Sequence, residues 1–232
     1  MSYRGRSTTR RSFGSYLFEF IVVAGAILLA FSINDWRKDK AQEKATTETW
    51  QRIQMVLSQD QQKLVDKAQA LDESINHIQV YLNVDKRKTP IDSLQSLVYP
   101  CLQYSVWSPP TSMGKFTSAK SMEMADSPLF GDIMALYGEE FEQLSQLSSM
   151  DQEVSTQRII PFAESRFNFL QNPNGKKKAR RADFAYGEFD AVLTTSLSIK
   201  SSTAESLREA ARKMEHIRNQ INDMISVQSQ KN

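Results

Sequence analysis

Cysteine and histidine are scarce in this chain of 232 residues. Cys101 is the only cysteine, which excludes an intrachain disulfide bond and a metal cluster held by several thiolates. The two histidines, His77 and His216, have no second histidine or acidic pattern at the spacing of a zinc motif. We therefore expect no bound metal and no cofactor.

Glycine-based catalytic signatures are missing as well. The eight glycines form neither a phosphate-binding loop nor a dinucleotide fingerprint, and no serine stands in a Gly-x-Ser-x-Gly elbow. We name no catalytic residue and expect that the protein is not an enzyme. The net charge of +2 gives no general argument for nucleic acid or for an acidic partner.

Helix-breaking residues are absent from a long stretch of the amino-terminal half. No glycine lies between Gly25 and Gly114, and no proline precedes Pro90. Residues 34–83 are rich in the helix-favouring Gln, Lys, Glu, Ala and Leu. Apolar residues recur there every seven positions: Trp50, Leu57, Leu64, Leu71 and Ile78. The pattern predicts an amphipathic helix of about 50 residues that continues directly from the segment before it.

Three polar residues interrupt the same face of this helix. Asp60, Lys67 and Ser74 stand at complementary positions of the repeat. A strict coiled-coil seam needs apolar residues at those positions, so the pattern favours a helical bundle.

The rest of the chain also predicts helices. A short helix is expected at 92–99, and Ser127-Pro128 starts another that Pro161 kinks or ends. A turn at 172–175 precedes a last helix at 189–227, where clustered Ser and Thr could bend or interrupt the backbone. Because no strand-like alternation persists, we predict an all-α fold.

One apolar run dominates the amino-terminal region. Leu17 to Ile33 are 17 residues with a single ionisable group, Glu19. Tyr16 and Trp36 flank the run as aromatic residues do at membrane interfaces. We predict a transmembrane helix at 16–36, after a basic arm at 1–15 and before a helical extramembrane domain at 37–228 with a tail at 229–232. The lipid bilayer is thus an expected partner.

Small residues mark a possible packing face on this span. Ala26 and Ala30 are four residues apart, with Gly25 beside them and Glu19 on roughly the same face. Small residues at this spacing let two helices approach closely, which predicts self-association through this face; the competing interpretation is that alanine is simply common in membrane spans. Glu19 is either part of this function or simply reaches the lipid headgroups.

The basic residues that flank the apolar run do not by themselves decide which side of the membrane the long domain occupies. Four basic residues lie on each side of the run: Arg4, Arg6, Arg10 and Arg11 before it, and Arg37, Lys38, Lys40 and Lys44 after it. The acid-free arm is typical of a signal-anchor, which favours the arm inside and the long domain outside; in a bacterial inner membrane, this orientation would make the domain periplasmic. A cleaved twin-arginine signal ending near 30–32 is the competing interpretation, which Glu19 disfavours.

A basic run follows the turn at 172–175. Lys176, Lys177, Lys178, Arg180 and Arg181 could contact an anionic surface such as lipid headgroups. A solvated turn between helices explains the same run. Without interleaved aromatic residues or a nucleic-acid motif, we expect no nucleic-acid partner.

The span also resembles a known family. Two stretches are similar to bacterial single-span membrane proteins of unknown function, of the domain of unknown function 6090 type. They are Glu19-Phe20-Ile21-Val22-Val23-Ala24-Gly25 and, after it, Ala30-Phe31-Ser32-Ile33-Asn34-Asp35-Trp36. The similarity extends to Trp107-Ser108-Pro109-Pro110-Thr111 and to the helix with Leu136-Tyr137, but the chain departs from the family pattern at Ser32. The resemblance implies a membrane-anchored helical domain and transfers no catalytic residue.

Two functions fit these features. The first is an interaction or scaffold protein of the bacterial envelope that binds a protein partner or a second copy of itself. The second is a sensor-like domain that binds a small ligand between its helices and acts through a membrane partner. An envelope enzyme has the least support in the sequence.

Overall fold

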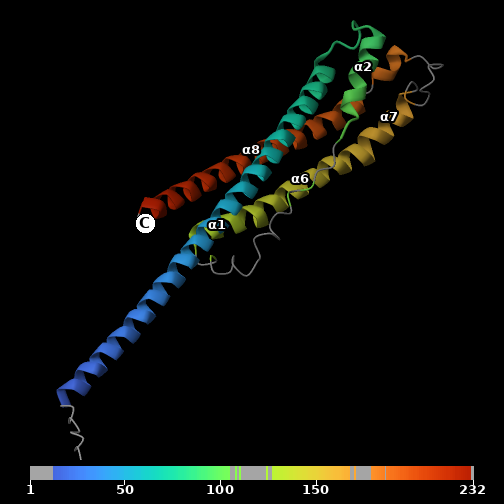
Figure 1. The fold of residues 1–232 in the computed structure, drawn as a ribbon. Helices are drawn as coiled ribbons and strands as arrows, with labels where there is room; N and C mark the ends of the chain where they lie inside the picture. Colours follow the sequence, from blue (N-terminus) through green and yellow to red (C-terminus); the bar gives the residue numbers. More distant parts are fainter. Residues whose placement is uncertain are drawn as a thin grey trace, which may run out of the picture. The chain divides into compact units, whose positions relative to one another are not determined.

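The computed structural model is helical in every regular element that it describes (Figure 1). It describes residues 13–104, 108, 110, 124, 127–167, 170, 179–185 and 187–230, with side-chain surroundings for all of these except 13–21 and 228–230. The all-α prediction is confirmed for this part of the chain. The chain divides into two compact units, Met1–Thr49 and Trp50–Asn232.

Helix α1 runs from Phe13 to Asn83 without a break. Its 71 residues include no proline, which would remove a backbone hydrogen bond and end or kink the helix. The prediction that the helix of 34–83 continues from the apolar run is therefore confirmed. A turn comes next, in which the amides of Lys88 and Thr89 donate to the carbonyl of Asp85.

The remaining described helices are α2 (Ile91–Cys101), α5 (Pro128–Ala135), η1 (Leu136–Glu140), α6 (Phe141–Val154), η2 (Ser155–Ile159), α7 (Ile160–Arg166), η3 (Arg181–Phe184) and α8 (Gly187–Gln230). The segments from α5 to α7 form one helical run in which η1 and η2 are single π-helical turns. Three of these parts lie where they were predicted, namely α2, the helical run that begins at Pro128, and α8, whereas η3 and the two π turns were not predicted. Pro161 does not end this run, because it occupies the first turn of α7, directly after the π turn η2.

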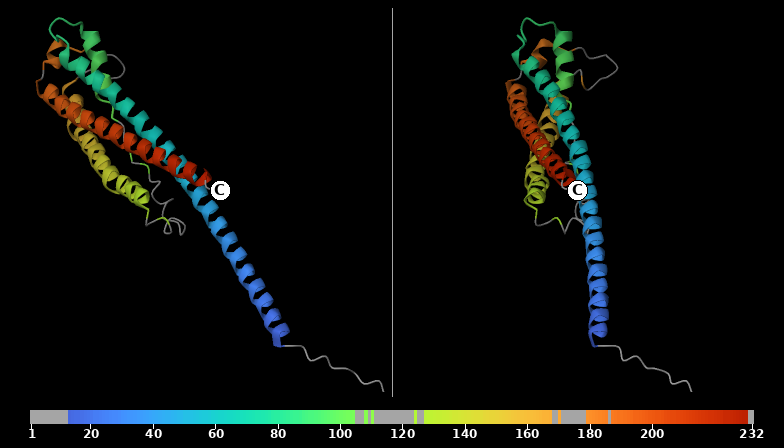
Figure 2. Two further views of the ribbon diagram at one scale, coloured as in Figure 1. Left: turned by 90° about the vertical axis from the view of Figure 1, so that its left-hand side faces the viewer. Right: turned by 60° about the vertical axis from the view of Figure 1, so that its left-hand side comes forward.

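In the unit Trp50–Asn232, α1, α8 and the helical run from α5 to α7 pack side by side (Figure 2). α1 and α8 are antiparallel, because Gln54 bonds Asn222, Gln61 bonds Arg218 and Asp72 bonds Arg208. The helical run of η1 and α6 is antiparallel to α8 by the same reasoning, since Lys213 bonds Glu140 of η1 and Lys200 bonds Asp151 of α6. The arrangement is a three-helix bundle, with α2 beside its upper end in Figure 1.

The core of this bundle consists of two apolar clusters. The first contains the stripe from Trp50 to Leu71 together with the α8 residues from Ala204 to Ile221. The second begins at Ile78 and includes Leu193. In it, the rings of Tyr81, Phe162 and Phe167 contact Phe189, and the ring of Phe184 contacts Phe167. The predicted apolar stripe is thus the buried face of α1.

Clustered hydroxyl residues do not interrupt α8. The hydroxyls of Thr194, Thr195 and Thr203 each donate to the carbonyl four residues earlier, at 2.7, 3.1 and 2.7 Å. These bonds satisfy the hydroxyl groups within the helix, and α8 is continuous, so of the two predicted effects, a bend or an interruption, the interruption is wrong.

Candidate functional site

Large apolar side chains are exposed along α1 in the unit Met1–Thr49. Between residues 22 and 33, seven of them are more than half exposed: Val22, Val23, Ile27, Leu28, Leu29, Phe31 and Ile33. Successive residues of a helix point about 100° apart, so these side chains face every direction around the axis. A continuous exposed apolar surface marks contact with a protein or a lipid.

The predicted span coincides with this surface only in part. Tyr16 and Glu19 lie outside the residues whose side chains are described. Trp36 is exposed at the end of the apolar segment. In the described part of the chain, no helix is long and apolar enough to cross a membrane.

The small residues of the predicted packing face lie at the helix surface. Ala26 and Ala30 are exposed, and a Cβ atom built on Gly25 would meet no other atom within 4 Å. This part of α1 can therefore be approached closely by another helix. Glu19, the fourth predicted member of the face, is not among the described side chains.

The predicted basic patch is described only at its last two residues. Lys176, Lys177 and Lys178 lie outside the described residues. The guanidinium of Arg181 donates to the carbonyls of Lys86 and Arg87, at 2.6 Å each, and so ties η3 to the chain after α1. Arg180 is exposed and pairs with Asp183 at 3.7 Å.

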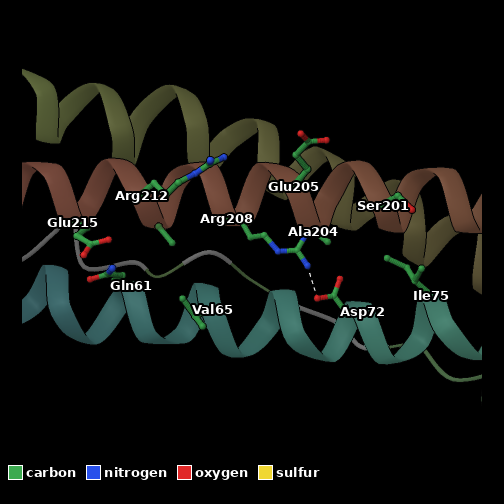
Figure 3. Close-up of a pocket in the computed structure, with 11 residues that line it drawn as sticks. Gln61, Val65, Asp72, Ile75, Ser201, Ala204, Glu205, Arg208, Arg212 and Glu215 are labelled. Carbon is green, nitrogen blue, oxygen red and sulfur yellow. Dashed lines mark hydrogen bonds and ion pairs between the residues drawn. The ribbon is translucent and has the colours of Figure 1, made fainter.

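A groove of about 640 Å³ runs between α1 and α8 on the surface of the bundle. In Figure 3, Arg208 reaches across from α8 to the carboxylate of Asp72 on α1. Its apolar lining comes from Val65, Ile75, Ala204 and Ala211, and its charged lining from Asp72, Glu205, Arg208, Arg212 and Glu215. The groove therefore carries charges of both signs around an apolar floor, with no excess of positive charge.

A buried ion pair lies in the layer between the two apolar clusters. The ammonium of Lys200 on α8 donates to Asp151 on α6 at 2.6 Å, and both residues are buried. The hydroxyl of Ser196, also fully buried, is 3.4 Å from the second oxygen of Asp151. Burial and the neighbouring Lys200 lower the pKa of Lys67, which belongs to the same layer. This layer of buried polar side chains separates the two apolar clusters of the core from each other.

A second buried polar contact joins α1 to η1. The hydroxyl of Tyr137 donates to Asp60 at 2.8 Å, and Lys63 donates to the other oxygen of Asp60 at 2.8 Å. Burial raises the pKa of Tyr137, and the negative charge of Asp60 raises it further.

Both polar contacts lie close to π-helical turns. Tyr137 belongs to η1, and the buried Ser155 of η2 comes one turn after Asp151. π turns inside α-helices occur frequently at functional sites, because the extra residue changes the direction of nearby side chains. Sequence patterns gave no signal for either π turn.

The polar positions on α1 were visible in the sequence, but their partners were not. Asp60 meets Tyr137, Lys67 lies close to Lys200 and Asp151, and Ser74 has a buried hydroxyl without a hydrogen-bond partner among the described residues. Each polar residue that interrupts the apolar stripe of α1 therefore lies at a buried hydrogen bond, lies near a buried ion pair, or carries a buried hydroxyl.

Metal-ligating side chains are dispersed over the described part of the chain. No group of three or more His, Cys, Asp and Glu side chains within it could hold a metal ion. His77 lies on α1 and His216 on α8. Burial raises the pKa of the Cys101 thiol to about 12, which keeps it protonated.

Comparison of the chain with known protein families, with curated proteins and with solved structures gave no match. The resemblance to the single-span family therefore stays a prediction, and the function rests on the features of the chain itself.

Proposed function

We propose that this chain is a single-pass, membrane-anchored interaction protein of the bacterial envelope, with residues 16–36 as its transmembrane helix. The observation that carries the proposal is the apolar surface of α1, which is exposed in every direction between Val22 and Ile33. A helix that is apolar all round is unfavourable in water and favourable in hydrocarbon. The bilayer is thus the first partner of the chain.

The remaining chain supplies the interacting domain. α1 continues without a break from the apolar segment to Asn83, so the bundle is attached to the anchor by helix and not by a loop. In this proposal the basic arm lies in the cytoplasm and residues 37–228 lie in the periplasm. The α1–α8 groove, with an apolar floor and charges of both signs, suits a protein surface better than a polyanion.

A second copy of the chain is the partner that the anchor fits best. Ala26 and Ala30 are exposed one turn apart, and the space around Gly25 is open. Two such helices pack closely in lipid because small side chains allow backbone contact. The proposed oligomer is a dimer through this face.

Anchoring is tested by alkaline carbonate extraction of membranes that contain the full chain. Wild-type protein should stay in the membrane pellet. Leu28→Lys combined with Leu29→Lys should release it, because each lysine in mid-span costs about 3 kcal/mol of insertion free energy. Met150→Lys, which changes an exposed apolar residue of α6, is the matched control and should remain in the pellet. Wild-type protein in the carbonate supernatant would overturn the anchor.

Self-association is tested by oxidative crosslinking of single-cysteine substitutions in membranes. Ala26→Cys and Ala30→Cys should give disulfide-linked dimers. Leu28→Cys points about 200° away from Ala26 around the helix and should give few. Cys101 needs no removal, because it is buried and its pKa of about 12 leaves almost no thiolate. Equal crosslinking at all three positions, or none, would exclude this face as the dimer interface.

A further inference from the structure

The α1–α8 groove on the surface of the bundle has the length of a helix-docking site. It extends from Gln61 to Ile75 on α1 and from Ser201 to Glu215 on α8. Each interval is about 21 Å of helix at about 1.5 Å per residue. A groove of this length, bordered by two helices, fits the side of another helix better than it fits a compact ligand.

The lining of the groove lets a neighbouring helix approach closely. Ala204 and Ala211 of α8 are buried at its floor and carry only methyl groups. Val65 of α1 is 43% exposed and projects toward α8 in Figure 3. The distance between two packed helices depends on the size of the side chains at their contact, and small residues allow a short one. The groove thus offers apolar area and room for a partner helix.

The ion pair between Asp72 and Arg208 can form further bonds on the groove side. The two side chains are 50% and 47% exposed. A guanidinium has five N–H donors and a carboxylate has about four acceptor sites, so their mutual contact does not exhaust either group. A partner that presents a carboxylate to Arg208 and a basic group to Asp72 would add two charge-assisted hydrogen bonds.

A second copy of the chain carries this charge pattern. Because Asp72 bonds Arg208, the two residues lie at the same level of the antiparallel pair of α1 and α8. A two-fold axis along the pair preserves that level and sets α1 of one copy beside α8 of the other. Asp72 of each copy then faces Arg208 of the other, and four charges of alternating sign surround the axis.

The anchor gives the two-fold axis this direction. Two copies held in one membrane extend their α1 helices the same way, so the docking rests on the function proposed above in this respect. We propose that the α1–α8 groove packs against the same groove of a second copy and so extends the dimer from the span to the bundle. The contact is separate from the face of Ala26 and Ala30.

Crosslinking of the full chain in membranes with a flexible bismaleimide reagent tests this contact. Val65→Cys lies in the groove and should give dimers. Met150→Cys, at an exposed position of α6 outside the groove, is the matched control and should give few. If Val65→Cys gives no dimer, or is linked only to a different protein, a second copy does not occupy the groove.

Charge reversal shows whether the contact uses Asp72 and Arg208. Asp72→Arg or Arg208→Asp, each combined with Val65→Cys, should lower the dimer yield about tenfold, because all four charges at the axis then have one sign. Coexpression of the two variants with different tags should restore dimers that contain one copy of each, because arginines then face aspartates. Repulsion inside each copy is unchanged by the partner, so it cannot cause this rescue. Missing rescue, or full crosslinking of either variant alone, would overturn the proposal.

The cysteine of Ala26→Cys separates this contact from the dimer of the span. It should still crosslink when Asp72 or Arg208 is reversed, because the span lies outside the groove. A dimer through Ala26→Cys without one through Val65→Cys would refute the groove contact alone. The opposite result would refute the face of the span alone.

Discussion

Asp60 shows how a single polar residue can belong to an apolar stripe. It is almost fully buried on the packed face of α1, yet both of its carboxylate oxygens accept hydrogen bonds, one from Tyr137 and one from Lys63. A buried carboxylate without such partners would destabilise the fold by several kcal/mol. At the residue scale, Asp60 is tolerated on the packed face because η1 supplies one donor and α1 itself supplies the other.

Tyr137→Phe should lower the free energy of unfolding by about 1–3 kcal/mol. The ring would still pack on Phe141, whose centroid lies 4.8 Å away, but the buried Asp60 would lose one donor. Urea denaturation followed by circular dichroism measures the change. Tyr104→Phe, at a partly exposed tyrosine, is the control and should shift the midpoint little. Equal midpoints for both variants would contradict the importance of the Asp60 bond.

The pair Asp151–Lys200 should behave as a coupled unit. Asp151→Asn or Lys200→Gln alone should cost about 3–5 kcal/mol, because each leaves a buried charge without its partner. The double variant should cost less than the sum of the two single variants. A double-mutant cycle by urea denaturation gives the coupling energy. Strictly additive costs would mean that the two groups contribute independently, despite their distance of 2.6 Å.

At the scale of elements, the π turns on either side of α6 set the register of the bundle. Each π turn adds a residue to the helical run and so rotates the side chains of the next segment around the helix axis. Tyr137 lies within η1 and meets Asp60 on α1, and Pro161 falls at the start of α7, where it needs no backbone hydrogen bond. A regular α-helix from Pro128 to Arg166 would place these side chains differently.

Gly131→Ala should stabilise α5 and with it the bundle. Gly131 lies inside the helix, and a Cβ atom built on it would meet nothing within 4 Å. Alanine in a helix interior is favoured over glycine by about 0.5–1 kcal/mol, because it loses less backbone entropy on folding. Thermal unfolding should show a higher midpoint. A lower midpoint would indicate that the helix needs the flexibility of glycine here.

At the scale of the whole molecule, several protons are held more tightly in the folded bundle than in the unfolded chain. Burial raises the pKa of Cys101 from 9.0 to about 12. Burial also raises the pKa values of Tyr81 and Tyr137 above 10.0, with Asp190 and Asp60 adding to the effect. In each case the folded state favours the neutral, protonated form.

Stability should therefore fall in alkaline solution. These groups contribute fully below their unfolded pKa values, and the contribution is lost as the pH rises from 9.0 through the folded value near 12. Above pH 9.0 the unfolded chain binds fewer protons than the folded one, so the free energy of unfolding decreases with pH. Urea midpoints between about pH 7 and about pH 11 measure this decrease. Cys101→Ala should decline less steeply than the wild type, and identical slopes would exclude the thiol as a cause.

Local sequence patterns were enough to predict the long helices, α2 and the buried face of α1. Local propensity, proline placement and the seven-residue repeat depend on residues close in the chain, and they located α1, α2, α8 and the start of α5 to within a few residues. The partners of the polar residues, in contrast, follow from the packing of the helices. Asp60 and Tyr137 are 77 residues apart, and Asp151 and Lys200 are 49 apart. No local pattern encodes such pairs, because they depend on the register that the π turns and the helix packing impose.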